Sequence, residues 1–260
     1  SFDLSRAPLL RVRLLECSGE QRLLLVAHHL IVDAVTWRII LEDLVNVYAD
    51  VLSGRPVKLD EKTMSQDEWL TLRLAELPLL SVKETDLWRS MALDPVTDFP
   101  GESILSTQGE RLTRDLVINK QATSRFFDAG AEKLKANAAE LLLAALVATV
   151  RDLWGVSSTR VLLESLGRDE RVSRTCGWFT SLYPVRFDLA GDDLAVVIKV
   201  KETMRRIPDQ GIGYGLLRLA ADTPLSHDLA SAEPPPIMFN YLGDVTPIFG
   251  KFFEAAEEEV

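Results

Sequence analysis

Residues 28–37 read HHLIVDAVTW and end an apolar run, Arg22 to His28, that has the composition of a β-strand. Two of the three histidines of the chain stand side by side there, and Asp33 follows four residues after His29. Asp33 can cap a helix, because a carboxylate accepts hydrogen bonds from the first backbone amides of a helix. Apolar residues then recur at helical spacing until Gly54. The stretch is therefore predicted to be a junction between a strand and a helix.

The paired histidines offer one side chain to any given pocket, because neighbouring residues on a strand point to opposite faces. A metal would need further ligands, and His227, the two cysteines and the carboxylates show no ligand spacing, so we expect no metal site. An imidazole can give and take protons near neutral pH. Two interpretations stay open at this point: one histidine works in a cleft, or both are simply hydrogen-bonded at the end of a strand.

Around this junction, turn residues and apolar periodicity predict alternating strands and helices. The predicted elements are a hairpin of 9–15 with 22–28, helices near 82–91, 138–154 and 194–206, strands over 111–118, 160–164, 177–187 and 237–243, and a loop over 208–215. A stretch rich in Pro, Gly, Ser and Thr, residues 94–109, predicts the boundary between two lobes, 1–100 and 101–260. The predicted class is α/β, with α+β layered packing.

Composition excludes several classes of protein. The chain has 260 residues, a net charge of -10 and 47% hydrophobic residues, so a nucleic-acid partner is not expected. Its apolar runs are too short to span a bilayer and no leader is recognisable, so the expected location is the cytoplasm without a membrane partner. Cys17 and Cys176 offer no disulfide framework and are interpreted as packing thiols.

Two further polar clusters stand out, one at the end of the strand predicted over 160–164 and one that overlaps the strand predicted over 177–187. ESLGRDER begins at Glu164, and RTCGWFTSLYP begins at Arg174. A carboxylate at the end of a buried strand is a candidate general acid or base, although strand-end glutamates are more often simply solvated. The PDQGIGYG segment from Pro208 lacks the lysine of a nucleotide-binding loop, so we interpret it as backbone shape.

Taken in order, six segments resemble the motifs of the epimerization domains of nonribosomal peptide synthetases, which are relatives of the condensation domains. HHLIVDAVTW resembles HHxxxDxxSW, with Thr36 in the serine position, and ESLGRDE resembles EGHGRE. The other four segments are ELLLAAL from Glu140, RTCGWFTSLYPV from Arg174, PDQGIGYG from Pro208 and FNYLG from Phe239.

The resemblance implies two lobes, each similar to chloramphenicol acetyltransferase, in a V arrangement. Family domains have a further N-terminal segment that completes the first lobe, so the resemblance also implies that the first lobe is incomplete here. The chain is thus expected to be a fragment of a multidomain synthetase.

The implied reaction inverts the α-carbon of an aminoacyl or peptidyl thioester held on the phosphopantetheine arm of an upstream carrier domain, with no bound cofactor. By resemblance, His29 and Glu164 are the acid/base pair, and either could abstract the proton. Asn240 and Tyr241 would position the substrate or its enolate.

The resemblance gives other residues of these motifs structural roles. His28 would be the packed histidine and Trp37 a support of the site. Asp33 would pair with Arg174 or Arg168.

The chain departs from the family at Leu166, where EGHGRE has its histidine, and at Ser165, where it has a glycine. This departure could weaken turnover. The alternatives are an amide-forming condensation domain and a catalytically degenerate scaffold. Ala34 and Thr36-Trp37 follow the epimerization pattern, whereas condensation domains usually continue HHxxxDG.

Overall fold

The computed structural model describes residues 2–17, 19–96, 112–243, 253, 254 and 256. The chain divides into two compact units. The first comprises Ser1–Arg73, Leu166–Thr180 and Leu242–Val260, and the second comprises Leu74–Ser165 and Ser181–Tyr241. The chain therefore passes between the units after Arg73, Ser165, Thr180 and Tyr241. The predicted lobe boundary at residues 100 and 101 lies outside the described residues.

The first unit contains the predicted hairpin. Strands β1 (Leu10–Cys17) and β2 (Glu20–Ala27) pair antiparallel, with Leu10 opposite Ala27. Helices α1 (Ala34–Leu52) and α2 (Gln66–Glu76) follow, and the last turn of α2 belongs to the second unit. The chain comes back to the first unit in Leu166–Thr180, called here the returning segment. It contains a short 3₁₀ helix, η4 (Glu170–Val172). The hairpin and α1 are confirmed, although β2 ends before the two histidines.

Both helices of the first unit begin at side-chain caps, of which the sequence predicted Asp33. The Thr36 amide donates to Asp33 Oδ1 at 2.7 Å. Ser65 and Glu68 form a reciprocal capping box at the start of α2, in which each backbone amide donates to the side chain of the other residue. Such caps satisfy amides that have no partner within the helix.

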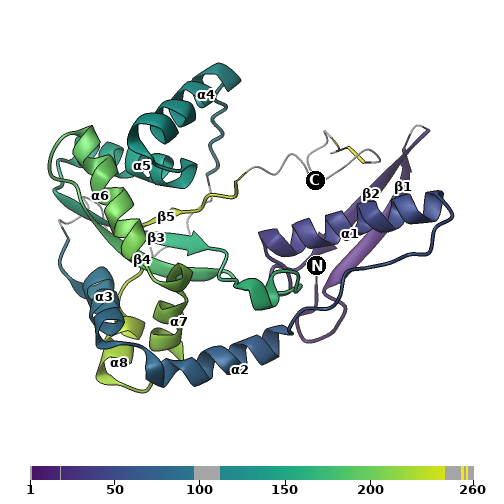
Figure 1. The fold of residues 1–260 in the computed structure, drawn as a ribbon, viewed down its shortest axis with the longest axis horizontal. Coiled ribbons are helices and arrows are strands. Elements are labelled where there is room, and N and C mark those ends of the chain that lie inside the picture. Colours follow the sequence, from purple (N-terminus) through teal and green to yellow (C-terminus); the bar gives the residue numbers. More distant parts are fainter. Residues whose placement is uncertain (1, 18, 97–111, 244–252, 255, 257–260) are drawn as a thin grey trace. The chain divides into compact units, whose positions relative to one another are not determined.

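The second unit is built on a three-stranded sheet in the order β4-β3-β5 (Figure 1). Strand β3 (Ser158–Ser165) pairs antiparallel with β4 (Ser181–Asp188) and parallel with the short β5 (Ile237–Phe239). Its helices are α3 (Val82–Leu93), α4 (Lys120–Ala129), α5 (Ala138–Trp154), α6 (Asp193–Arg206), α7 (Ile212–Leu219) and α8 (Pro224–Ser231), with short turns η1 (Leu77–Leu79), η3 (Gly130–Leu134) and η5 (Asp209–Gly211).

One face of this sheet carries the main core. Val161, Leu163 and Val185 are at most 3% exposed and belong to the same apolar cluster as Leu143 and Val147 of α5. Helices α5 and α6 pack on each other and on this sheet. The other face is more open: Leu182 and Met238 are 42% and 58% exposed. Alternation along β3 therefore turns Leu163 into the core and Glu164 toward the open face.

Three predictions for the second unit need correction. Residues 112–119 form no strand, and Leu116 and Val117 there are 86% and 92% exposed. No described strand pairs with this segment, and an alternating apolar pattern does not form a strand without hydrogen-bond partners. Strand β4 begins at Ser181 rather than residue 177, and α7 replaces the second half of the loop predicted over 208–215.

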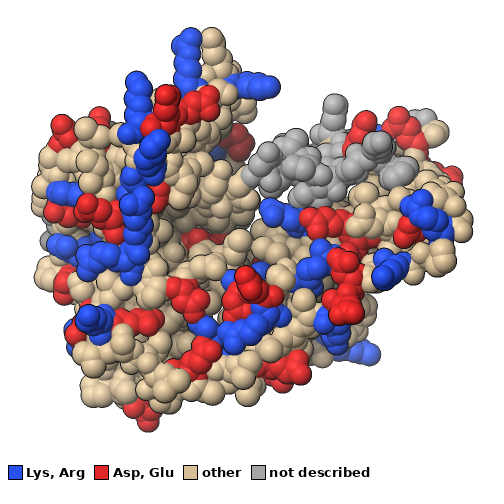
Figure 2. Space-filling model, in the orientation of Figure 1, with Lys and Arg blue, Asp and Glu red and all other residues tan. Residues whose placement is uncertain are grey.

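The predicted class of layered α and β elements is confirmed. No helix among the described residues is long and apolar enough to cross a membrane. Figure 2 shows acidic and basic side chains intermixed over one face of the molecule, with basic side chains gathered over α6.

Candidate active site

The two adjacent histidines lie in different surroundings in the first unit. His28 is half-buried, and its backbone amide donates to the Leu9 carbonyl at 2.9 Å. The Nδ1 atom of His28 accepts a hydrogen bond from the Leu30 amide at 3.2 Å, so His28 is the histidine whose ring is hydrogen-bonded to the protein. His29 is exposed in the turn between β2 and α1. Its ring lies 5.4 Å from the ring of Trp178, centroid to centroid.

Asp33 is the centre of a buried network. It is 4% exposed, and both of its carboxylate oxygens accept hydrogen bonds from Arg168 Nη2 at 2.9 Å. Its Oδ2 atom also accepts from the Phe179 amide at 3.1 Å. Of the two arginines that the sequence offered as its partner, the structure selects Arg168. A carboxylate engaged in this way orients its neighbours and is not available to take a proton from a substrate.

Arg168 fixes the returning segment against α1. Besides its ion pair with Asp33, its guanidinium donates to the carbonyls of Val172, Thr175 and Gly177. It also lies over the Phe179 ring, 4.2 Å from the centroid. At 8% exposed, this arginine joins a charge pair, four carbonyl or hydroxyl acceptors and an aromatic face, which is a structural role.

Arg174, the other arginine of interest, binds acidic residues outside this network. Its guanidinium contacts the carboxylates of Glu42, Asp43 and Asp60. Trp37 is half-buried in the first turn of α1, and its amide donates to the Asp33 carbonyl. Arg174 thus contacts α1 and Trp37 is part of α1, so both residues support the helix that follows the histidine turn.

Asp169 next to this network has a strongly perturbed acidity. The pKa of Asp169 is lowered to about 2, mainly by the hydrogen bond from Arg171 and also by the Trp69 indole, which donates at 2.9 Å, while burial acts in the opposite direction. The pair therefore stays ionised at neutral pH and holds η4 on α2.

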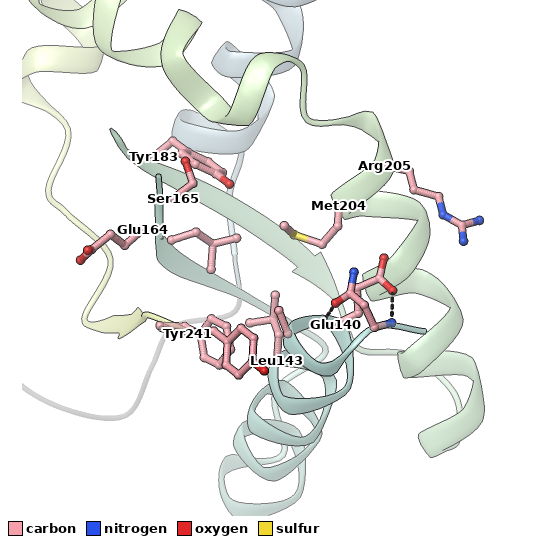
Figure 3. Close-up of a pocket in the computed structure, with 12 residues that line it drawn as sticks. Glu140, Leu143, Glu164, Ser165, Tyr183, Met204, Arg205 and Tyr241 are labelled. Carbon is pink, nitrogen blue, oxygen red and sulfur yellow. Dashed lines mark hydrogen bonds between the residues drawn. The ribbon is translucent and has the colours of Figure 1, made fainter. Parts of the chain in front are cut away.

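Glu164 belongs to the second unit, at the end of β3. It is half-buried, and its carboxylate has no hydrogen bond or ion pair with any residue that the structure describes. Figure 3 shows it pointing to the opposite side of β3 from Met204 and Leu143. The carboxylate therefore lies on the open face of the sheet.

Asn240 and Tyr241 follow β5, beside the end of β3. Phe239 pairs with Leu163, so Asn240 comes next at the level of Glu164. Both Asn240 and Tyr241 are exposed. Tyr241 and Glu164 are both among the residues that line one cavity of the second unit, but the Glu164 carboxylate points away from it (Figure 3).

That cavity has a volume of about 330 Å³ and lies beside the core face of β3 (Figure 3). Leu143, Met204 and Phe239 give it apolar walls, and the capping box of Asn137 and Glu140 at the start of α5 lies at its polar end. Sequence reasoning did not single out these walls, because they come from separate elements.

Tyr183 also lines the cavity. Burial raises the pKa of Tyr183 above its usual value, more than a hydrogen bond with Ser165 lowers it. Its phenol is therefore protonated at neutral pH and can donate a hydrogen bond.

The two departures from the family pattern differ in their surroundings. Ser165 donates to the Gln210 carbonyl at 2.6 Å and lies 2.8 Å from the Ser181 hydroxyl, so it ties the ends of β3 and β4 to η5. Leu166 is 54% exposed. Among the described residues, no group of three His, Cys, Asp or Glu side chains is arranged to hold a metal ion.

Comparisons with known proteins identify the family. The family model of the condensation domain matches residues 1–259. Bacitracin synthase 2 of Bacillus licheniformis is 35% identical over an alignment of 256 residues that covers 94% of this chain and 10% of that protein. The chain spans 4 to 10% of the lengths of the first curated synthetases that it matches.

Solved structures of similar proteins allow the fold to be compared as well. The crystal structure of the epimerization domain from the third module of tyrocidine synthetase B is 31% identical with a TM-score of 0.78, over 93% of this chain and 56% of that one. The first condensation domain of the CDA synthetase is 18% identical with a TM-score of 0.65, over 89% and 51%, which shows the fold alone. The resemblance to epimerization domains is thus confirmed, and the solved structures also confirm the fold class of condensation domains. This chain belongs to the condensation-domain superfamily of nonribosomal peptide synthetases.

Proposed function

We propose that this chain inverts the α-carbon of an aminoacyl or peptidyl thioester, from L to D, within a nonribosomal peptide synthetase. The substrate hangs on the phosphopantetheine arm of an upstream carrier domain. One group removes the α-proton, the thioester carbonyl takes up the negative charge as an enolate, and a second group returns a proton to the opposite face. We assign these two groups to His29 and Glu164, and no bound cofactor is needed.

The observation that carries this proposal is the unengaged carboxylate of Glu164 at the end of β3. A carboxylate can exchange a proton with carbon only if no arginine already occupies it, and Asp33 shows the opposite case. The imidazole of His29 is exposed and is likewise without a hydrogen bond to any described residue. Two available proton-transfer groups are what inversion by a two-base route requires.

Asn240 and Tyr241 are proposed to bind the thioester oxygen or the enolate. The register of β5 with β3 puts the segment that carries them beside Glu164. An amide or a phenol can donate a hydrogen bond to an oxygen that gains negative charge, and such donors typically contribute a hundredfold or more to rate.

The test uses the synthetase module that carries this chain, with its carrier domain loaded with an L-aminoacyl group. The D to L ratio after thioester hydrolysis and the uptake of solvent deuterium at the α-carbon are measured. We expect D product and deuterium uptake in the wild type and a loss of at least about a hundredfold in His29→Ala and Glu164→Gln. His227→Ala is the matched control, because His227 is an exposed histidine paired with Asp222 and has no assigned role.

An amide-forming condensation reaction is the second candidate, and the match to the condensation family model favours it. It predicts a condensed peptide product that depends on His29 and not on Glu164. An L-only product with no amide formed would leave the degenerate scaffold.

A further inference from the structure

Trp178 is a large aromatic residue held at the surface of the first unit. It is 41% exposed and precedes the buried Phe179 in the returning segment. Its indole ring lies 5.4 Å from the imidazole of His29, with 51° between the ring planes. An exposed tryptophan leaves apolar surface in water, so its position needs an explanation other than core packing.

The backbone on both sides of Trp178 is fixed by α1. The Thr36 hydroxyl donates to the Gly177 carbonyl at 2.8 Å and accepts from the Gly177 amide at 3.1 Å. The Phe179 amide donates to Asp33 at 3.1 Å. Displacing the backbone that carries Trp178 would therefore break hydrogen bonds that are buried.

A third clamp holds Trp178 itself. The Gln66 side chain at the start of α2 donates to the Trp178 carbonyl at 2.7 Å. Gly177 makes room for this bond, because a Cβ atom there would lie 2.6 Å from Gln66 Oε1. Hydrogen bonds from α1 with its cap and from α2 thus fix the backbone that carries this exposed indole.

The imidazole of His29 has no comparable support from polar groups. No described residue forms a hydrogen bond with its ring nitrogens, and its ring lies against the ring of Trp178. A ring held by an aromatic face keeps both nitrogens available, whereas a hydrogen-bonded imidazole would lose one of them.

We propose that Trp178 is a positioning residue for the reaction: its indole sets the orientation of the His29 imidazole from which a proton is exchanged with the substrate α-carbon. This inference rests on the proposed function. A misplacement of a reacting group by about 1 Å can cost about a hundredfold in rate, so loss of the indole should act on kcat.

The first experiment reads the ring contact without any turnover. The chain has three histidines, whose ring protons are to be followed by proton NMR. The spectrum of His29→Ala assigns the signals of His29. We expect the ring current of Trp178 to displace these resonances from their free-histidine positions. In Trp178→Leu they return toward those positions, and in Trp178→Phe they stay displaced because a flat aromatic face remains.

The second experiment measures α-proton exchange in the loaded synthetase module. We expect Trp178→Leu to lower kcat by about ten- to a hundredfold with an unchanged KM for the loaded carrier, and Trp178→Phe to restore most of the rate. Trp154→Leu is the matched control, because Trp154 is a tryptophan of similar exposure, 39%, at the end of α5.

Wild-type kcat in Trp178→Leu, unchanged His29 resonances in that variant, or equal damage in Trp178→Phe would each overturn the inference. A wild-type module that yields only L product and takes up no deuterium would instead reject the proposed function. The NMR result would then decide alone whether Trp178 orients His29, so the two failures are distinguishable.

Discussion

At the scale of single residues, the pair of Asp33 and Arg168 dominates the first unit. Both side chains are at most 6% exposed, and besides their ion pair Asp33 accepts from the Phe179 amide and Arg168 donates to the Thr175 carbonyl. Removing one partner of a buried pair leaves the other charge without compensation, which costs about 3–5 kcal/mol. We expect Asp33→Ala to lower the free energy of unfolding by about this amount in urea titrations.

The matched control for that prediction is Asp60→Ala, because Asp60 is 73% exposed in its ion pair with Arg174. Exposed pairs contribute about 0–1 kcal/mol. Equal losses in the two variants would contradict the role assigned to the buried pair.

Asp169 provides a prediction about pH. Its pKa in the folded chain is about 2, mainly because of Arg171, and an unfolded aspartate has a pKa of about 3.9. A lowered folded pKa stabilises the protein above the unfolded value, and this contribution is lost as the pH falls through about 4 toward 2. We expect Asp169→Asn to cost about 1 kcal/mol at pH 7, because solvent screens this partly exposed pair. Urea titrations between pH 7 and 3 should show the difference shrinking below pH 4; a constant difference would reject the assignment.

Sequence predicted these residues better than it predicted their partners. Asp33 was predicted as a cap from the helix that follows it, which is local information. Asp33 pairs with Arg168 and not with Arg174 because of the way in which residues 166–180 return to α1. The sequence around the two arginines does not distinguish them as partners of Asp33. The contact of Trp178 with His29 depends on the same return of residues 166–180 to α1. The motif RTCGWFTSLYPV alone therefore could not predict it.

At the scale of elements, the start of α7 depends on a glycine. Gly211 has φ +79°, and a Cβ atom there would lie 2.0 Å from the Tyr183 ring. Gly215, four residues later and inside α7, has nothing within 4 Å of such an atom. We expect Gly211→Ala to destabilise the chain by at least about 2 kcal/mol, and Gly215→Ala to stabilise it by up to about 1 kcal/mol. Thermal unfolding of the two variants compares them directly, and similar values would show that the left-handed turn is not required.

Elements were predictable where their signals are local. Helix α5 has the predicted bounds because Asn137 and Glu140 form a capping box and Gly155 ends it with φ +65°. The strand predicted over 111–118 is absent from residues 112–118, since a strand is defined by a partner that the pattern does not supply. Helix α7 was missed because two glycines lower helix propensity, while burial of Ile212, Tyr214 and Leu217 outweighs that cost.

At the scale of the whole molecule, apolar burial is unevenly divided. The main core cluster, from Trp88 to Leu229, lies entirely in the second unit. In the first unit, Val12 and Leu14 of the hairpin are 58% and 60% exposed. Its order rests instead on the polar network around Asp33 and on the T-shaped contact of Trp69 with Phe179. The scaffold of Glu164 is thus an apolar core, and the scaffold of His29 is a hydrogen-bond network.

This division predicts how the two parts open. Local opening requires less free energy where few apolar contacts are lost, so amide hydrogen exchange should differ between the units. We expect the amides of β3, β4 and α5 to exchange slowest and those of β1 and β2 to exchange at least about tenfold faster, which corresponds to about 1.4 kcal/mol of opening free energy. Mass spectrometry of peptides from deuterated protein measures both sets in one sample. Asp33→Ala should accelerate exchange in α1 and in residues 166–180 and leave β3 unchanged, because the Asp33 carboxylate contacts α1 and residues 166–180. Acceleration throughout the chain would show instead that the two units unfold as one.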